Sequence, residues 1–211
     1  MPLESPVYPV DLVVQGRRCL VVGGGRVAAG KVRNLRAAGA IVHVVAPEIA
    51  DEIASMPEVT VERRRYRRGE VAGYRLAIAA TGDAEVNGAV FNDGEDAGVW
   101  VNSADDPARC SFTLPSVVRQ GHLMVTVSTG GHSPAMSRWL ADRFERAIGP
   151  EFSVLLDLLS AERRAVKAEG RSTEGLDWQK ALDSDMLALI KAGQIQQARE
   201  RLQACLSSSS A

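Results

Sequence analysis

Two neighbouring carboxylates, Asp105 and Asp106, are candidates for moving a proton. They follow an apolar run at residues 99–101 and stand just before Pro107. A carboxylate at the end of a buried strand can accept a proton from a bound substrate. Adjacent acids before a proline also suit a solvated turn, and their spacing alone favours the turn.

A glycine-rich stretch near the N-terminus, residues 23–28, suits phosphate binding. It follows the apolar residues 19–22 and runs into a helical pattern. Gly23 and Gly25 would let the backbone turn sharply and approach a pyrophosphate, and Ala28 takes the third small position, where helix and strand pack. The first N–H groups of the helix and its dipole favour an anion there. This order predicts nucleotide binding, and the alternative is a glycine turn that binds nothing.

Two further polar segments stand where a ligand could bind. Residues 81–83, with Asn87 on the following helix, suit the ribose or nicotinamide side of a cofactor, or else a helix-capping turn. Residues 128–134 combine hydroxyl groups, two glycines and a helix start, which suits either an anion-binding loop or an ordinary capped turn. The sequence leaves both pairs of alternatives open.

The arginine-rich run at residues 63–68 is the one strong concentration of charge. Such a run usually forms a solvated surface, and attraction of an acidic ligand is the second interpretation.

The end of the second apolar run bears on the choice of nucleotide. An acidic residue normally binds the ribose at this position, but the run ends in Val44, Val45 and Ala46, and Glu48 lies further along the chain than that acid usually does. This motif therefore leaves the choice between NAD and NADP undecided.

Alternating strand-like and helical segments must position these residues. The continuous small-apolar run at residues 76–80 is typical of a central parallel strand that is covered on both faces. The alternation predicts an α/β fold, a Rossmann-like doubly wound parallel sheet. Strands are expected at residues 19–22, 41–45, 59–62, 76–80 and 99–102, helices at 27–38, near 49–56 and at 86–97, and an edge strand or lead-in at 7–14.

The pattern changes near residue 111. Strand-like runs at 111–118 and 122–128 predict a β-hairpin, and Ser133 and Pro134 suit the cap and first turn of a helix. From Glu151 onward the pattern is helical. We expect a nucleotide-binding domain at 1–112, a hairpin-plus-helix segment at 113–149, a C-terminal all-helical domain at 150–206 and a disordered tail at 207–211.

Composition excludes several classes of protein. A net charge of −1, a pI of about 6.3 and 5% aromatic residues give no support to binding of nucleic acid or anionic lipid. The three cysteines are scattered and the three histidines form no pair at metal-ligand spacing, so neither a disulfide framework nor a permanent metal site is expected. No membrane span or signal peptide is recognisable, which favours a cytoplasmic protein.

Several motifs occur together in an order that generic dinucleotide-binding proteins have no reason to carry. They are residues 21–28 with Lys31, 77–81 with Val86 and Asn87, Val101 and Asn102 with Asp105, Ser111 and Phe112 with 114–116, and 127–134. With them, the chain resembles the siroheme-synthase dehydrogenase family, which comprises precorrin-2 dehydrogenases that are often also sirohydrochlorin ferrochelatases. The resemblance spans residues 7 to about 150, and the last three motifs are the most specific.

The resemblance implies an activity and partners. It implies NAD-dependent oxidation of precorrin-2 to sirohydrochlorin and, in bifunctional members, insertion of Fe²⁺ to give siroheme. It also implies a homodimer in which residues 113–149 form the dimerisation segment. Asp105 aligns with an aspartate proposed as the general base, which favours catalysis over a turn at this position. Asp106 replaces a residue that is usually uncharged.

The resemblance also implies contacts. Ser128 aligns with a serine of the tetrapyrrole-binding cleft, and a macrocycle with eight carboxylates needs cations and N–H donors. The implied NAD contacts are Gly23, Gly24, Gly25, Arg26, Val27, Ala46, Pro47, Thr81 and Asn102. The expected substrate contacts are Ser128, Thr129, Gly130, Gly131, His132, Arg138 and Arg109, and no metal ligand is expected.

Two other functions compete with this one. The first is a non-enzymatic module that senses NAD(H), with the helical C-terminus as a partner interface. The second is an NAD(P)-dependent reductase of a small carbonyl compound, against which stands the absence of a Tyr-x-x-x-Lys pair and of a histidine placed as a proton donor. Hydride transfer distinguishes the sensing module, which binds NAD but turns over no tetrapyrrole.

Overall fold

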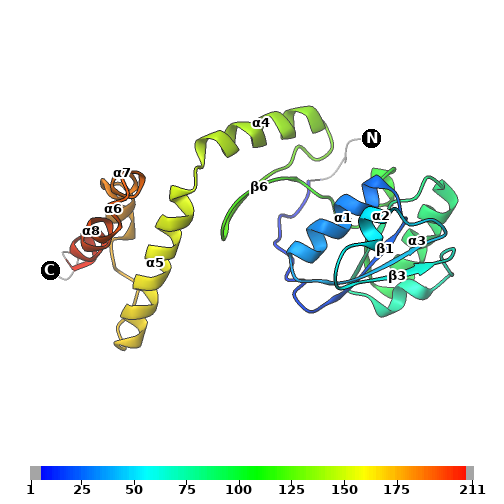
Figure 1. Cartoon of the computed structure of the whole chain (residues 1–211), viewed down its shortest axis with the longest axis horizontal. Helices are drawn as coiled ribbons and strands as arrows, with labels where there is room; N and C mark the ends of the chain where they lie inside the picture. The colour runs from blue at the N-terminus through cyan, green and yellow to red at the C-terminus, as the bar shows by residue number, and fades with distance from the viewer. Residues whose placement is uncertain (1–5, 208–211) are drawn as a thin grey trace. The chain divides into compact units, whose positions relative to one another are not determined.

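The computed structural model describes residues 6–207, which divide into two compact units (Figure 1). Of these residues, 6–114 and 129–133 form the first unit, and 115–128 and 134–207 form the second. The chain thus returns briefly to the first unit at residues 129–133 before α4 begins.

The first unit is built on a five-stranded parallel sheet with the strand order β3-β2-β1-β4-β5. The order reverses between β1 and β4, which makes the carboxyl ends of these two strands the usual place for a ligand. This sheet confirms the predicted doubly wound fold. The strands are β1 (Arg18–Val22), β2 (Ile41–Ala46), β3 (Val59–Arg63), β4 (Leu76–Ala79) and β5 (Trp100–Ser103).

Two layers of helix bury the faces of this sheet. On one face, α1 (Arg26–Ala37) and α2 (Asp51–Ala54) pack against Val42 and Val44. On the other, α3 (Ala84–Ala97) and the short helix η1 (Glu70–Gly73) pack against Leu20 and Ala77. Every residue of β4 is buried, so its continuous apolar character follows from cover on both sides.

The chain returns along the outer side of β5 after the short helix η2 (Pro107–Arg109). Cys110 forms an antiparallel bridge with Asn102, and the Ser111 N–H donates to the Val101 carbonyl over 2.8 Å. The Val101 N–H in turn donates to Ser111 Oγ over 2.7 Å. This return occupies part of the predicted strand 111–118, of which only residues 116–118 lie in a strand, β6.

The second unit contains the predicted hairpin and only helices after it. The antiparallel strands β6 (Ser116–Gln120) and β7 (Leu123–Val127) pack with α4 (Pro134–Ala147) around Val118, Val127 and Ala141. A separate apolar cluster, which includes Leu158, Met186 and Leu202, joins the remaining helices. They are α5 (Glu151–Ala168), α6 (Trp178–Leu182), α7 (Met186–Lys191) and α8 (Ile195–Ser207).

Smaller differences from the predicted elements occur near the two ends of the described chain and at α2. Residues 7–14 form no strand and are exposed except Val14, so they are a lead-in. The helix expected near residues 49–56 is reduced to α2. Ser207 ends α8, and the rest of the expected tail, 208–211, lies outside the described residues. Between residues 6 and 207, no helix combines the length and apolar character needed to cross a membrane.

Candidate functional site

The glycine corner, residues 23–25, joins β1 to α1 and leaves no room for side chains at its first two positions. A Cβ on Gly23 would lie 2.3 Å from the Ala80 carbonyl oxygen, and Gly23 has a φ of +128°. A Cβ on Gly24 would lie 1.9 Å from the carbonyl oxygen of Glu48. These two glycines are therefore required because neighbouring loops pack directly on them.

Gly25 and the start of α1 differ because they face open space. A Cβ on Gly25 would meet nothing within 4 Å, and Gly25, Arg26 and Val27 are exposed. The twelve-residue helix has no side-chain cap at its N-terminus and no acidic residue in its first turn. Its first N–H groups and its dipole are thus directed at a space that suits a phosphate group. The corner fits a dinucleotide pyrophosphate.

The other residues expected to bind the cofactor follow the neighbouring strands. Ala46 ends β2 and is buried, whereas Pro47 is exposed. Thr81 follows β4, and Asn102 lies in β5. Since these strands are parallel, their ends lie at one edge of the sheet beside the glycine corner. The structure brings these residues to a common edge, and contact with NAD remains a prediction for each of them.

The turn after β4 forms the predicted helix cap. The Asp83 carboxylate accepts hydrogen bonds from the N–H groups of Glu85 and Val86 at the start of α3. Thr81 Oγ1 lies 2.7 Å from Oδ1 of Asn87, an asparagine that is fully buried. Capping thus accounts for Asp83, while Thr81 and Asn87 form a fixed polar pair at the site edge.

The side chain of Asn102 is largely used within the fold. Its Nδ2 donates to the Phe112 carbonyl over 3.0 Å and contacts Cys110 Sγ at 3.4 Å. The Ser103 N–H also donates to Cys110 Sγ, over 3.2 Å. These bonds fasten the end of β5 to the returning chain, so the position of the following residues is fixed.

The two adjacent carboxylates have separate environments. Asp106 caps η2 by accepting from the Ala108 N–H over 3.0 Å, and it forms an ion pair with Arg109 at 3.5 Å. Asp105 is exposed and accepts a 2.5 Å hydrogen bond from the Ser103 hydroxyl. The capping turn expected from the sequence belongs to Asp106, which leaves Asp105 as the carboxylate that faces solvent at the strand end.

Hydrogen bonding keeps Asp105 ionised. Removal of part of its hydration would raise the pKa of this carboxyl group, but hydrogen bonds from Ser103 and Asn87, together with the Arg109 charge, outweigh that effect and lower the pKa below its ordinary value. An ionised carboxylate can accept a proton, so the site has a proton acceptor at neutral pH.

Three residues beside Asp105 and the glycine corner are not among the predicted site residues. Ser103 holds Asp105, and Lys31 and Cys110 influence each other electrostatically. Burial lowers the pKa of the Lys31 amine, with Cys110 opposing, and raises the pKa of the Cys110 thiol. The signal in the sequence for Lys31 is its position, five residues after the start of a helix that begins at a phosphate-binding corner.

The expected substrate residues fall in both units. Residues 129–133 form a tight turn in the first unit, in which the Ser133 N–H donates to Thr129 Oγ1 over 3.1 Å, and Gly130 and Gly131 have φ values of +58° and +81°. Arg109 Nη1 donates to the Ala84 carbonyl in the same unit. Ser128 and the exposed Arg138 belong to the second unit, and His132 is exposed. A common substrate site remains a prediction.

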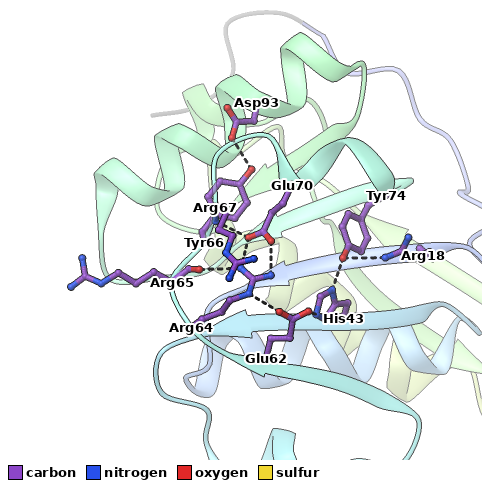
Figure 2. A network of polar contacts seen from close by, with 10 residues as sticks. All are labelled: Arg18, His43, Glu62, Arg64, Arg65, Tyr66, Arg67, Glu70, Tyr74 and Asp93. Atoms are coloured by element: carbon purple, nitrogen blue, oxygen red, sulfur yellow. Dashed lines mark hydrogen bonds and ion pairs between the residues drawn. The ribbon is translucent and has the colours of Figure 1, made fainter.

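The arginine-rich run separates into anchored and exposed residues (Figure 2). Arg64 binds the Glu70 carboxylate through two hydrogen bonds of 3.0 and 2.6 Å and also binds Glu62. Arg63, Arg65 and Arg67 are exposed, as expected for a solvated surface. The anchored half of the run is therefore structural.

Asp93 in α3 binds the second part of the same run through hydrogen bonds. This buried carboxylate accepts hydrogen bonds from Tyr66 Oη, the Gly69 N–H and Arg68 Nε at 2.7 to 2.8 Å. Burial alone would raise the pKa of Asp93, but these three donors lower it below its ordinary value.

No group of three or more histidine, cysteine or acidic residues that could hold a metal occurs within residues 6–207.

Comparisons with known proteins agree with this geometry. A family model described as NAD(P)-binding matches residues 10–116. Siroheme synthase of Nitrosococcus oceani is 36% identical over 203 residues, which cover 94% of this chain and 43% of that protein. Siroheme synthase of Chromobacterium violaceum is 37% identical over 201 residues, 93% of this chain and 43% of that protein. The chain thus spans less than half the length of these relatives.

A solved structure gives the same fold. It is named SirC, precorrin-2 dehydrogenase, and it superimposes with a TM-score of 0.70 over 94% of this chain and 98% of that chain. The two sequences are 24% identical, so this likeness concerns the fold.

Proposed function

Because the chain belongs to the NAD(P)-binding family whose model covers residues 10–116, we propose that it oxidises precorrin-2 to sirohydrochlorin with NAD as the cofactor. The observation that carries the proposal is the ionised Asp105 at the end of β5, two strands away from the open helix start at the end of β1. The siroheme synthases that match most of this chain support the choice of substrate.

The proposed cofactor contacts follow β1, and the proposed proton acceptor follows β5, at the carboxyl edge of the sheet. The start of α1 holds the pyrophosphate through backbone N–H groups, and Gly25 leaves the space for it. The bound nicotinamide supplies the acceptor for the hydride that leaves the macrocycle. Asp105 takes up the proton lost in the same oxidation, while Ser103 fixes the orientation of its carboxylate. The loop 129–133 and Arg109 in the first unit are proposed to bind carboxylates of the macrocycle, and substrate contact by Ser128 and Arg138 in the second unit is a separate proposal.

The test uses the two neighbouring acids as a matched pair. Asp105→Ala should lower the rate of NAD-dependent formation of sirohydrochlorin by about 100-fold or more, because a positioned base contributes at least that much. Its Kd for NAD should remain unchanged, since the nucleotide contacts are elsewhere. Asp106→Ala removes a turn cap and should retain most of the activity. Turnover near that of the wild type in Asp105→Ala would remove this residue from the mechanism. If the wild type itself binds NAD but does not oxidise precorrin-2, the sensing module is favoured.

Fe²⁺ as a second substrate is part of the proposal. Insertion of iron releases two protons from the pyrrole nitrogens, and Asp105 is the acceptor that the site offers for them. Addition of Fe²⁺ to the completed oxidation tests this, with a sample of sirohydrochlorin and Fe²⁺ without protein as control. Siroheme formation at equal rates in both would exclude the chelatase activity.

A homodimer is proposed from the exposed surface of the second unit. Its two-stranded sheet packs against α4, which supplies cover that such a sheet needs in water. Large apolar side chains nevertheless remain exposed on α4, among them Met136, Trp139 and Phe144. Sedimentation of the wild type as a monomer at micromolar concentration would contradict the dimer.

A cytoplasmic location is proposed as well, because the three cysteines are thiols, which persist in reducing compartments. Cell fractionation tests this location.

A further inference from the structure

The exposed half of the arginine-rich run lies beside the part of the edge where the cofactor ribose is expected. Arg63 is the last residue of β3, and its register partner on β2 is Ala46, an expected NAD contact. Arg65 lies two residues further on, and its side chain extends away from the ion pairs of Arg64 (Figure 2). Both side chains are exposed.

Within the described part of the chain, only the backbone of these two arginines has partners: Arg63 pairs with Ala46 in the sheet, and the Arg65 carbonyl accepts from Arg64. Arg64 is engaged by Glu62 and Glu70, and Arg68 by Asp93. The guanidinium groups of Arg63 and Arg65 make no hydrogen bond or ion pair with any residue between 6 and 207. The anchored arginines therefore hold the backbone of the run while two positive charges remain available to a ligand.

Strand alternation gives the face of the sheet on which Arg63 lies. Val59 and Val61 pack into the apolar cluster under α1 and α2, so Arg63, two residues on, leaves β3 on that same face. The loops that follow β1 and β2 meet there, since the Ala50 N–H donates to the Gly24 carbonyl over 2.9 Å. Arg63 thus stands at the face and edge where the nucleotide-binding loops come together.

The acid that would reject a ribose phosphate is missing from its usual place. In dinucleotide folds, an acidic residue about 20 residues past the glycine motif binds the ribose 2′-hydroxyl, whereas a nearby arginine accommodates a 2′-phosphate. Here β2 ends in Val44, Val45 and Ala46, and the first carboxylate after it is that of Glu48.

We propose that Arg63, assisted by Arg65, binds the 2′-phosphate of NADP, so that the site accepts this cofactor as well as NAD. A guanidinium group matches a phosphate with two parallel N–H donors, and the interaction is strengthened by the phosphate charge. The inference rests on the proposed nucleotide site and is independent of the tetrapyrrole substrate.

Calorimetric titration of the full chain separates this contact from catalysis. The wild type should bind 2′,5′-ADP more tightly than 5′-AMP, and NADP at least as tightly as NAD. Arg63→Ser should weaken binding of 2′,5′-ADP and NADP about tenfold and leave 5′-AMP and NAD within twofold. Arg75→Ser is the matched control, because Arg75 is also exposed but precedes β4 and so lies at the opposite end of the strands.

Each other outcome decides against the inference in a recognisable way. If the 2′-phosphate adds no affinity while NAD binds, the inference is wrong and the proposed function stands. If Arg63→Ser and Arg75→Ser weaken NADP equally, general attraction to positive charge replaces the specific contact. If neither NAD nor NADP binds to the folded wild type, the proposed function fails together with the inference.

Discussion

The glycine corner and the polar network formed by Arg64 with Glu70 and by Asp93 with Tyr66, Arg68 and Gly69 lie in the same unit but satisfy their polar groups in opposite ways. In the network, the Asp93 and Glu70 carboxylates receive donors from the neighbouring loop, and each is at most partly exposed. At the corner, the start of α1 has no side-chain cap, although capping residues are the common solution at helix starts.

This contrast separates structural polar groups from binding ones. Donors that stabilise the fold are paired within it, because an unpaired buried polar group costs about 1–3 kcal/mol. Donors that serve a ligand are left at the surface, where water satisfies them until the ligand arrives. Substitutions in the network should therefore affect stability, and substitutions on the open side of the corner should affect binding.

Gly24→Ala is expected to have the largest effect on stability. The added Cβ would meet the Glu48 carbonyl, so the β2–α2 loop has to move at a cost of about 3 kcal/mol. Thermal and urea unfolding measure the loss. Unchanged stability would mean that the two loops shift without cost, and the proposed difference between Gly24 and Gly25 would then disappear.

Asp93→Ala should destabilise the first unit by about 2 kcal/mol. The substitution leaves the Tyr66 hydroxyl and the Gly69 N–H without their buried acceptor. The control is Asp96→Ala, which removes an exposed carboxylate from the same helix and should change the unfolding free energy much less. Equal effects of the two variants would show that charge, and not the network, is responsible.

The pH dependence of unfolding sharpens the same contrast. Asp93 and Glu70 have lowered pKa values in the folded state, so their contributions to stability are complete above the unfolded values near 4 and are lost as the pH falls through the folded values. The unfolding free energy should thus fall between pH 5 and pH 3. Asp93→Asn should show a smaller slope over this interval, and an identical slope would exclude Asp93 as a contributor.

Gly25→Ala should have the smallest effect on stability, below about 1 kcal/mol, because the new Cβ meets no protein atom. Its φ of −88° suits alanine. The affinity for NAD should nevertheless fall about tenfold, since the methyl group fills space needed for the pyrophosphate. Calorimetry measures this, and unchanged affinity would place the cofactor elsewhere.

Most of the fold was predictable because hydrophobic periodicity reports burial directly. The fully buried β4 is a continuous apolar run, and the hairpin at Gly121 follows from a glycine with positive φ between two strand-like runs. The sequence predicts a strand from residue 111 onward, because Ser111 and Phe112 have the same local pattern as a strand, although the chain there returns along β5. Only the tertiary bridge to Asn102 distinguishes the two.

The candidate site was predictable in its parts but not in its pairings. The corner and Asp105 could be named from type and order alone. That Asp106 caps the turn while Asp105 faces solvent depends on which carboxylate reaches the Ala108 N–H, a matter of backbone geometry. The split of the arginine run likewise depends on Glu70, six residues after its partner Arg64, and on Asp93, 25 residues after its partner Arg68.

The return of the chain along β5 also protects the sheet from other molecules. An open edge strand is a template on which a foreign strand can form a ladder, and this is a common route to aggregation. Here the outward N–H and carbonyl of Val101 are already bonded to Ser111, and Cys110 receives the Ser103 N–H. The segment that fastens the strand before Asp105 thus also closes this edge to cross-β association.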